Sequence, residues 1–223
     1  MRSYSRPSFK SPGFFIVIDG PDAVGKTTQL DLVSQYLNVV SENMDFDVVV
    51  TRMPGGSTIG TDIRHLLLTD KTVNLTPITE LGLIMSERAQ HMDECIRPAL
   101  NRGNVVLCDR YIDSTLAYQG NGRGIDKDLI MDLNDKFTDN LYPDLTIILT
   151  ADQDTVDQRM DDRGQRDKLE NNEMAMVTRQ YFDDLKTLEK DNDRYVFIDA
   201  NLGVMDVSRC IVDAIERRLY LEQ

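Results

Sequence analysis

The stretch that decides the fold is Gly20-Pro21-Asp22-Ala23-Val24-Gly25-Lys26-Thr27, which satisfies the pattern G-x-x-x-x-G-K-[ST]. It follows the apolar residues 14–18 directly and opens a segment with helical periodicity, residues 27–37. Glycines allow the backbone to curl so that successive N–H groups point at phosphate oxygens, and the start of a helix adds the positive end of its dipole. Lys26 would span the β- and γ-phosphates of a nucleotide, and the Thr27 hydroxyl would bind Mg²⁺. The sequence therefore predicts a phosphate-binding loop.

The segments around this loop predict a layered α/β fold. Short runs rich in β-branched or aromatic residues occur at 14–18, 48–51, 105–108, 145–149 and 195–198. They are apolar without alternation, which is typical of parallel strands buried on both faces. Helical periodicity is found between and after them, at residues 27–37, 78–96, 127–137, 174–188 and 204–221. We therefore expect a three-layer fold of the P-loop NTPase type, in which helices cover both faces of a five-stranded parallel sheet.

The length of 223 residues suits one large domain, and we assign it to residues 13–223. Residues 1–12 are rich in serine and carry Arg2, Arg6 and Lys10, so we expect a flexible tail there. Residues 152–173 are crowded with charged side chains and poor in apolar ones. Taken alone, this segment reads as a solvated helix and loop.

Composition excludes several classes of protein. A net charge of −13 and a pI near 4.5 argue against nonspecific binding to nucleic acid, which needs a basic surface. The three cysteines are odd in number and far apart, so neither a disulfide framework nor a zinc motif is indicated, and a reducing, cytoplasmic setting is expected. No apolar run approaches the ~20 residues of a membrane span. The two histidines have no partner at metal-ligand spacing.

Charged residues follow two further strands. Asp109 and Arg110 come directly after residues 105–108, and Arg52 comes directly after residues 48–51. Because ligands of open α/β sheets bind beyond the carboxyl ends of the strands, these side chains should face the same crevice as the loop that carries Asp22 and Lys26. We expect Asp109 to hold Mg²⁺ through water. The convergence of the three cations predicts a cleft for two phosphorylated groups.

These residues resemble the thymidylate kinases of the P-loop nucleoside-monophosphate kinase superfamily, over residues 14 to about 221. The segments that carry the resemblance are residues 15–20, 25–29 (Gly-Lys-Thr-Thr-Gln), 51–56 (Thr-Arg-Met-Pro-Gly-Gly), 87–91 (Glu-Arg-Ala-Gln-His), 96–100 and 109–120 (Asp-Arg-Tyr-Ile-Asp-Ser-Thr-Leu-Ala-Tyr-Gln-Gly). The resemblance implies ATP- and Mg²⁺-dependent phosphorylation of a deoxypyrimidine monophosphate, most simply dTMP. It also implies a homodimer.

The resemblance further implies roles for individual residues. ATP would be bound by Gly20, Ala23, Val24, Gly25, Lys26, Thr27 and Thr28, with Mg²⁺ on Thr27 and Asp109. The acceptor would be bound by Asp22, Arg52, Ile84, Arg88, Arg110, Ser114, Thr115, Tyr118 and Gln119. Within this set, Asp22 would contact the 3′-hydroxyl, Arg52 and Arg110 would clamp the phosphate, and Tyr118 would crowd the 2′ position. Arg88 and Gln119 would hold the base.

Some members of the family carry a catalytic arginine in the phosphate-binding loop, but this chain has Ala23 at that position. The resemblance therefore implies that the charged segment supplies the arginine. An arginine near the γ-phosphoryl oxygens stabilises the charge that develops during transfer. Residues 152–173 would then form a lid over the bound nucleotides. The candidates for the catalytic arginine are Arg159, Arg163 and Arg166. We favour Arg163 or Arg166.

Two alternatives stay open at this stage. The family places a phenylalanine against the base one helical turn before Arg88, where this chain has Ile84. Thymine differs from uracil by one methyl group, from which a pocket extracts only ~1–3 kcal/mol, so dUMP is an alternative acceptor. The other alternative is a nucleotide-binding regulatory switch that phosphorylates no acceptor. Arg88, Tyr118 and Gln119, which are directed at base and sugar, argue against it.

Overall fold

The computed structural model describes residues 13–42, 44–70, 72–163 and 172–221. The predicted tail, residues 1–12, therefore lies outside the described residues, as does Arg166. The described part of the chain contains no helix long and apolar enough to cross a membrane.

All the strands of the described residues form a single parallel sheet, as predicted. They are β1 (Phe14–Asp19), β2 (Val48–Arg52), β3 (Val105–Asp109), β4 (Leu145–Thr150) and β5 (Tyr195–Asp199), in the order β2-β3-β1-β4-β5. Each strand ends one residue beyond its predicted run, and the added residue is polar in every case. Each strand thus extends to a polar residue, after which the chain leaves the sheet.

The helices that the periodicity predicts are present, and others are added. They are α1 (Lys26–Ser41), α2 (Gly60–Leu68), α3 (Pro77–His91), α4 (Arg97–Asn101), α5 (Ile112–Thr115), α6 (Lys127–Thr138), α7 (Gln153–Arg163), α8 (Asn172–Leu188) and α9 (Val204–Leu221), with two π-helical segments, η1 (Met92–Ile96) and η2 (Leu116–Gly122). The predicted helix 78–96 is therefore α3 continued by a π-helical turn. Neither α2 nor the α5–η2 pair was expected, and both carry side chains of the site.

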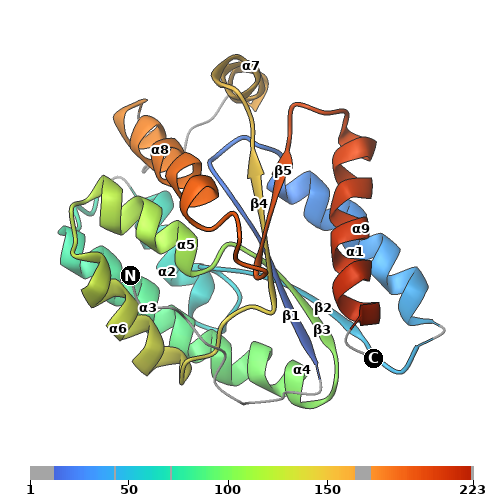
Figure 1. Ribbon diagram of the computed structural model, residues 1–223. Helices are drawn as coiled ribbons and strands as arrows, with labels where there is room; N and C mark the ends of the chain where they lie inside the picture. Colours follow the sequence, from blue (N-terminus) through green and yellow to red (C-terminus); the bar gives the residue numbers. More distant parts are fainter. Residues whose placement is uncertain (1–12, 43, 71, 164–171, 222–223) are drawn as a thin grey trace.

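The two faces of the sheet bury separate cores (Figure 1). Ile16 and Ile18 of β1 pack with α1 and α9, whereas Phe15 and Val17 of the same strand pack with α3, α4 and α6. This two-sided burial is the physical reason why the strand sequences show no alternation. A third cluster joins Ile148 of β4 to α8 and η2.

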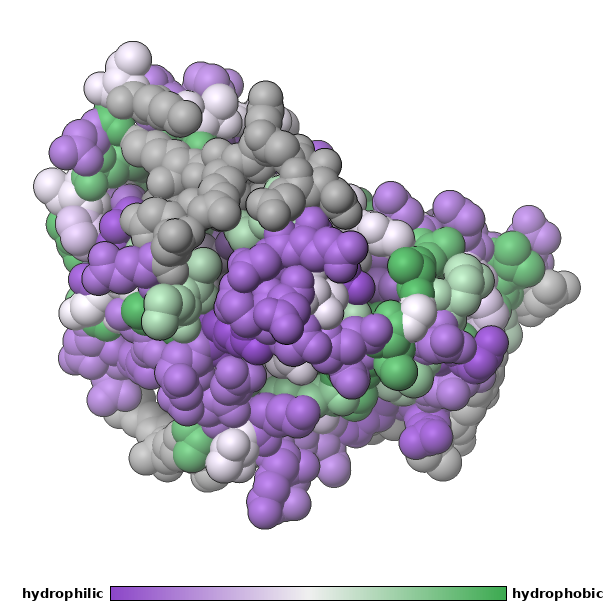
Figure 2. Space-filling view, turned by 90° about the horizontal axis from the view of Figure 1, so that it is seen from above, coloured by the Kyte–Doolittle hydropathy of each residue, from purple (hydrophilic) through white to green (hydrophobic). Residues whose placement is uncertain are grey.

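The charged segment after β4 is less solvated than its composition suggests. Its first part forms α7, and Val156 and Met160 on this helix are buried in the core that α1 and α9 share. The loops that follow β1, β3, β4 and β5 leave the sheet at the same edge. Figure 2 views the molecule from above this edge and shows mainly hydrophilic residues around its centre.

Candidate active site

The phosphate-binding loop follows β1 and leads into α1, as the motif predicts. Gly20 has a φ of +140°, and a Cβ atom built on it would lie 2.3 Å from the Leu149 carbonyl oxygen. Only glycine fits there. The glycine that precedes α1, Gly25, has no side chain to cap the helix, so the first-turn N–H groups face the cleft beside Thr27 and Thr28.

Lys26 lies inside the loop rather than above it. Its side chain is 7% exposed, and Nζ donates hydrogen bonds to the carbonyl oxygens of Gly20 at 3.0 Å and Pro21 at 2.5 Å. Burial, followed by the positive charge of Arg110, lowers the pKa of Lys26 to about 8. Both of these hydrogen bonds from the ammonium group go to carbonyl oxygens of the loop. Charged phosphate oxygens would accept stronger hydrogen bonds from it than these neutral carbonyl oxygens do.

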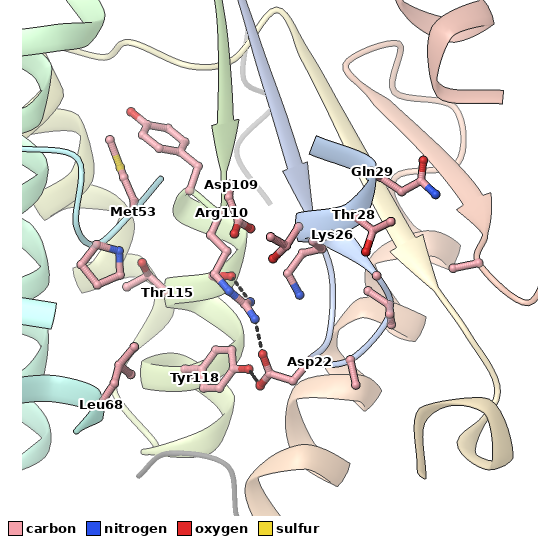
Figure 3. Close-up of a pocket in the computed structure, with 18 of the residues that line it drawn as sticks. Asp22, Lys26, Thr28, Gln29, Met53, Leu68, Asp109, Arg110, Thr115 and Tyr118 are labelled. Carbon is pink, nitrogen blue, oxygen red and sulfur yellow. Dashed lines mark hydrogen bonds and ion pairs between the residues drawn. The ribbon is translucent and has the colours of Figure 1, made fainter. Parts of the chain in front are cut away.

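Arg110 connects the end of β3 to the loop (Figure 3). Its Nη1 donates to Ser114 Oγ at 2.7 Å and to the Gly20 carbonyl oxygen at 3.2 Å, and its Nη2 forms an ion pair with Asp22. The other Asp22 oxygen accepts a hydrogen bond from the Tyr118 hydroxyl. Burial alone would lower the pKa of Arg110, but Tyr118 and Asp22 outweigh it and the pKa lies above its usual value. Arg110 is therefore a fixed cation.

Most of the predicted residues surround one cleft of about 480 Å³, a volume in the range of small-molecule sites. The predicted residues that line it are Asp22, Ala23, Val24, Gly25, Lys26, Thr27, Thr28, Ile84, Arg88, Asp109, Arg110, Ser114, Thr115, Tyr118, Gln119 and Arg159. Gly20 contributes its carbonyl oxygen to Lys26 and Arg110 without lining the cleft. Residues from four separate stretches of the chain, 22–28, 84–88, 109–119 and 159, thus meet at one site.

Arg52 does not line this cavity: its side chain is exposed at the end of the edge strand β2. Its assignment to the acceptor phosphate stays a prediction. Arg64 on α2 lines the cleft instead, and its Nη1 donates to the Pro54 carbonyl oxygen at 3.0 Å. In the sequence, the only hint was the i, i+4 pair Ile63 and Leu67, which are buried and mark the inner face of a short helix.

The far end of the cleft is built by α3, α5 and η2. Arg88 is 1% exposed; it donates to Asn134 Oδ1 at 2.9 Å and to Thr115 Oγ1 at 2.7 Å, and burial lowers its pKa. Its Nε has no hydrogen-bond partner among the described residues. Ile84 lies on the same helix and lines the same cleft. This end therefore offers an aliphatic wall beside a buried cation.

A buried carboxylate supports the turn that follows β2. Glu87 Oε1 accepts hydrogen bonds from the N–H groups of Gly55 at 3.1 Å and Gly56 at 3.2 Å. His91 Nε2 lies 2.6 Å from Thr51 Oγ1, and burial, then Arg88, lowers the pKa of His91 to about 4. A Cβ atom on Gly56 would lie 2.2 Å from the His91 ring, so this position requires glycine. His91 is thus a neutral, buried packing residue.

The other end of the cleft is formed by α7 and the segment after β5. Arg159 donates to the Val24 carbonyl oxygen at 3.2 Å and to the Ala200 carbonyl oxygen at 2.9 Å. Leu202 and Val204 line the cleft next to it. The sequence identified Arg159 as a candidate but gave no sign of this apolar wall. Arg163 ends α7.

Two oxygen-bearing side chains fit a divalent cation bound with phosphates. Asp109 Oδ1 is buried and has no hydrogen-bond partner among the described residues, while Thr27 is exposed at the mouth of the loop. The described residues contain no group of three histidine, cysteine or acidic side chains that could hold a metal by themselves. An ion at this site would therefore take most of its ligands from phosphate oxygens and water.

This arrangement defines the class of the protein. A phosphate-binding loop between β1 and α1, facing the same cleft as Arg110 directly after the neighbouring strand β3, is the site of a P-loop nucleoside-monophosphate kinase. Lys26 and Arg110 both line this cleft, where the phosphate groups of two nucleotides would meet.

Comparisons with known proteins identify the family. The model of the thymidylate kinase family matches residues 18–211. A thymidylate kinase of Exiguobacterium sp. strain AT1b is 41% identical over 93% of this chain and 96% of its own length, and one of Deinococcus radiodurans is 42% identical over 85% and 90%. The solved thymidylate kinase of Ehrlichia chaffeensis superimposes with a TM-score of 0.73 at 32% identity, covering 92% of this chain and 98% of that one. The chain belongs to the thymidylate kinase family, and it is a phosphotransferase.

Proposed function

We propose that the protein transfers the γ-phosphoryl group of ATP to dTMP, giving dTDP and ADP. The observation that carries this proposal is the single cleft into which both Lys26 and Arg110 point, with an apolar wall at each end. The thymidylate kinases of Exiguobacterium and Deinococcus radiodurans, to which the chain is similar, support dTMP as the acceptor. A phosphate oxygen of dTMP attacks the γ-phosphorus in line while the bond to the ADP oxygen breaks, so no covalent enzyme intermediate is needed.

The donor half of the proposal rests on the loop. Ala23, Val24, Gly25, Thr27 and Thr28 surround the triphosphate, and Lys26, bonded to the Gly20 carbonyl oxygen, spans its β- and γ-phosphates. The adenine base lies against Leu202 and Val204, next to Arg159. Thr27 and Asp109 are the residues that would hold Mg²⁺, which when bound neutralises phosphate charge.

The acceptor half rests on β3, α3, α5 and η2. Arg110 and Ser114 hold the acceptor phosphate, joined by Arg64 in place of Arg52. The residues assigned to the nucleoside are Asp22, Ile84, Arg88, Thr115, Tyr118 and Gln119. The bond between Asp22 and Tyr118 supports this assignment, because it brings the group meant for the 3′-hydroxyl next to the ring meant for the 2′ position.

The lid assignment, residues 152–173 with Arg163 or Arg166 as the catalytic arginine, stays a prediction. Arg159 is bound to two carbonyl oxygens that flank the donor side of the cleft, which supports a role in holding the donor rather than in the transfer step. Of the other two, Arg163 is the last residue of α7, the helix that also carries Arg159. An arginine brought in from this side would meet the γ-phosphoryl oxygens.

We include a homodimer in the proposal. α3 and α6 pack against each other, and the large apolar side chains Ile78, Leu129 and Phe137 on these two helices are exposed in the single chain. A second copy would cover them, because exposed apolar surface of this kind is typical of interfaces. Light scattering of the purified protein measures the mass: a dimer supports this part of the proposal and a monomer contradicts it.

The proposed reaction is tested by ADP release with ATP as donor and dTMP, dUMP, dCMP, dGMP and UMP as acceptors. We expect dTMP to give the highest kcat/KM, and dUMP to follow within about 10- to 200-fold, because a single methyl group separates them. UMP should be a poor acceptor because Tyr118 crowds the 2′ position. ADP release that does not depend on any monophosphate would contradict the proposal and favour a regulatory switch. A higher kcat/KM for dUMP than for dTMP would make dUMP the acceptor instead.

The first prediction compares Arg64, which lines the cleft, with Arg52, which does not. Arg64→Ala should raise the KM for dTMP by about 10- to 100-fold, the range for losing a hydrogen bond to a charged group. Arg52→Ala is the matched control, since it removes an exposed arginine from the adjoining edge strand and should change this KM less than about twofold. Steady-state kinetics at saturating ATP measure both. A larger effect at Arg52 would restore the prediction made from sequence.

The lowered pKa of Lys26 gives a pH dependence. The ammonium group binds phosphate only when protonated, so kcat/KM for ATP should be constant below pH 8 and fall tenfold per unit well above it, since the pKa of Lys26 is about 8. Lys26→Arg keeps its charge at every working pH, so its profile should stay flat from pH 7 to 10, whatever its activity. A decline with the same midpoint in Lys26→Arg would assign the titration to another group.

A further inference from the structure

Asp19 is a buried carboxylate that the proposed reaction does not use. It is the last residue of β1, directly before the phosphate-binding loop, and its exposed fraction is 0%. Oδ1 accepts hydrogen bonds from the Gly20 N–H and the Ser114 hydroxyl at 2.8 and 2.7 Å, and Oδ2 accepts from the N–H groups of Tyr111 and Ser114 at 3.2 and 3.1 Å. Burying a carboxylate costs free energy unless it is hydrogen-bonded, and these four hydrogen bonds offset that cost.

These contacts tie the donor half of the site to the acceptor half. The Gly20 bond holds the beginning of the loop, and the Tyr111 and Ser114 bonds hold the beginning of α5, which carries the acceptor residues. Arg110 stands between them with a positive φ of 68°, a conformation that costs free energy for a residue with a Cβ atom. Asp19 holds the backbone directly after Arg110 through the Tyr111 N–H, and the Arg110 N–H itself donates to the Ile18 carbonyl oxygen at 3.0 Å.

The chemistry of the donors fixes the direction of each bond. A carboxylate can only accept and a guanidinium can only donate, so the one hydrogen of the Ser114 hydroxyl points to Asp19 and its lone pair points to Arg110. Asp19 Oδ1 is also 3.7 Å from Arg110 Nη1. The orientation of the Arg110 guanidinium therefore depends on a carboxylate that lies behind Ser114.

We propose that Asp19 is a positioning residue that holds Arg110 and Ser114 in register with the phosphate-binding loop, so that the acceptor phosphate meets the donor at the right place. This inference rests on the proposed function, since it assigns Arg110 to the acceptor phosphate. Asp19 does not line the cleft. Its effect reaches the reaction through the Arg110 guanidinium, to which the Ser114 hydroxyl links it.

Asp19→Asn is the informative variant because it keeps the shape and removes the charge. Its amide group would place a donor among four donors, so at least one of these bonds must break and the Ser114 hydroxyl loses its fixed direction. We expect the KM for dTMP to rise about 10- to 100-fold, the range for a lost charge-assisted hydrogen bond, while the KM for ATP changes less than about threefold.

Asp144→Asn is the matched control. Asp144 Oδ2 accepts a hydrogen bond from the Phe15 N–H at 2.8 Å, so this carboxylate holds the opposite end of the same strand, remote from the cleft. Both variants should lower the melting temperature, whereas only Asp19→Asn should shift the KM for dTMP. Equal KM values for wild type and Asp19→Asn would overturn the inference, and a wild type without dTMP turnover would overturn the proposed function instead.

A double-mutant cycle with Arg110→Ala separates positioning from general damage. If Asp19 acts through Arg110, Asp19→Asn should add less than about twofold to the dTMP dissociation constant of Arg110→Ala, measured by calorimetry. Should Asp19→Asn not fold, Asp19→Glu keeps a carboxylate but moves it by one methylene group. Its effect should likewise disappear in the Arg110→Ala background, and a fully additive effect would overturn the inference.

Discussion

Lys26→Met should leave the protein folded and reduce kcat for dTMP phosphorylation by about two to three orders of magnitude, the range for removing one preorganised electrostatic group. Methionine keeps the length and the apolar stem of the side chain. It also removes a charge whose burial lowers its pKa to about 8, so the melting temperature should not fall by much. The loss therefore measures the interaction of the ammonium group with the transferred phosphoryl group.

The control for Lys26→Met is Lys136→Met, which removes an exposed lysine from α6 and should leave kcat unchanged. Single-turnover assays at saturating ATP and dTMP distinguish slow chemistry from weak binding. A Lys26→Met enzyme that retains more than a tenth of the wild-type rate would contradict the role assigned to this residue. It would also remove the support for the phosphate-binding loop as the donor site.

Arg110→Lys should raise the KM for dTMP about 100-fold and reduce kcat as well, although the positive charge is kept. The two terminal nitrogens of the guanidinium contact Ser114, the Gly20 carbonyl oxygen and Asp22 at once. A single ammonium nitrogen on a flexible stem cannot reproduce this planar geometry. The position also requires a positive φ, which the substitution does not relieve. The KM for ATP should change much less.

Arg97→Lys is the control for Arg110→Lys. Arg97 also pairs with two carboxylates, Asp93 and Asp139, but all three side chains are partly exposed. Ion pairs of this kind contribute ~0–1 kcal/mol, so lysine should serve there without a change in stability or kinetics. Similar behaviour of the two variants would show that Arg110 acts as a charge alone.

Patterns local in the chain predicted much of this protein. The motif that contains Lys26 required no knowledge of the fold, because its residues lie in one turn and contact one group of atoms. Strand runs without alternation predicted burial on both faces, and the separate packing of Ile16 and Phe15 confirms it. Asp109 was expected at the end of a strand because carboxyl ends of parallel strands share one edge.

What the sequence did not predict concerns residues whose position depends on distant parts of the chain. Arg52 is the last residue of an edge strand and its side chain is exposed, whereas Arg110 follows an inner strand and lines the cleft. Arg64 lies in a helix that was not predicted, and the turn before that helix is held by Glu87 from α3. Val156 and Met160 are buried although the composition of their segment indicated a solvated one. No local pattern contains this information.

The sequence by itself determined the class of the fold, the phosphate-binding loop and the kind of reaction, because each depends on residues adjacent in the chain or on a repeated pattern of burial. Only the tertiary structure showed that Arg64 lines the same cleft as Arg110, and that Ser114 connects Arg110 to Asp19. Asp19 and Ser114 are 95 positions apart, and their bond exists because β1 and β3 are neighbours in the sheet. A hydrogen bond of 2.7 Å between such residues is a property of the packed layers, which a linear pattern does not encode.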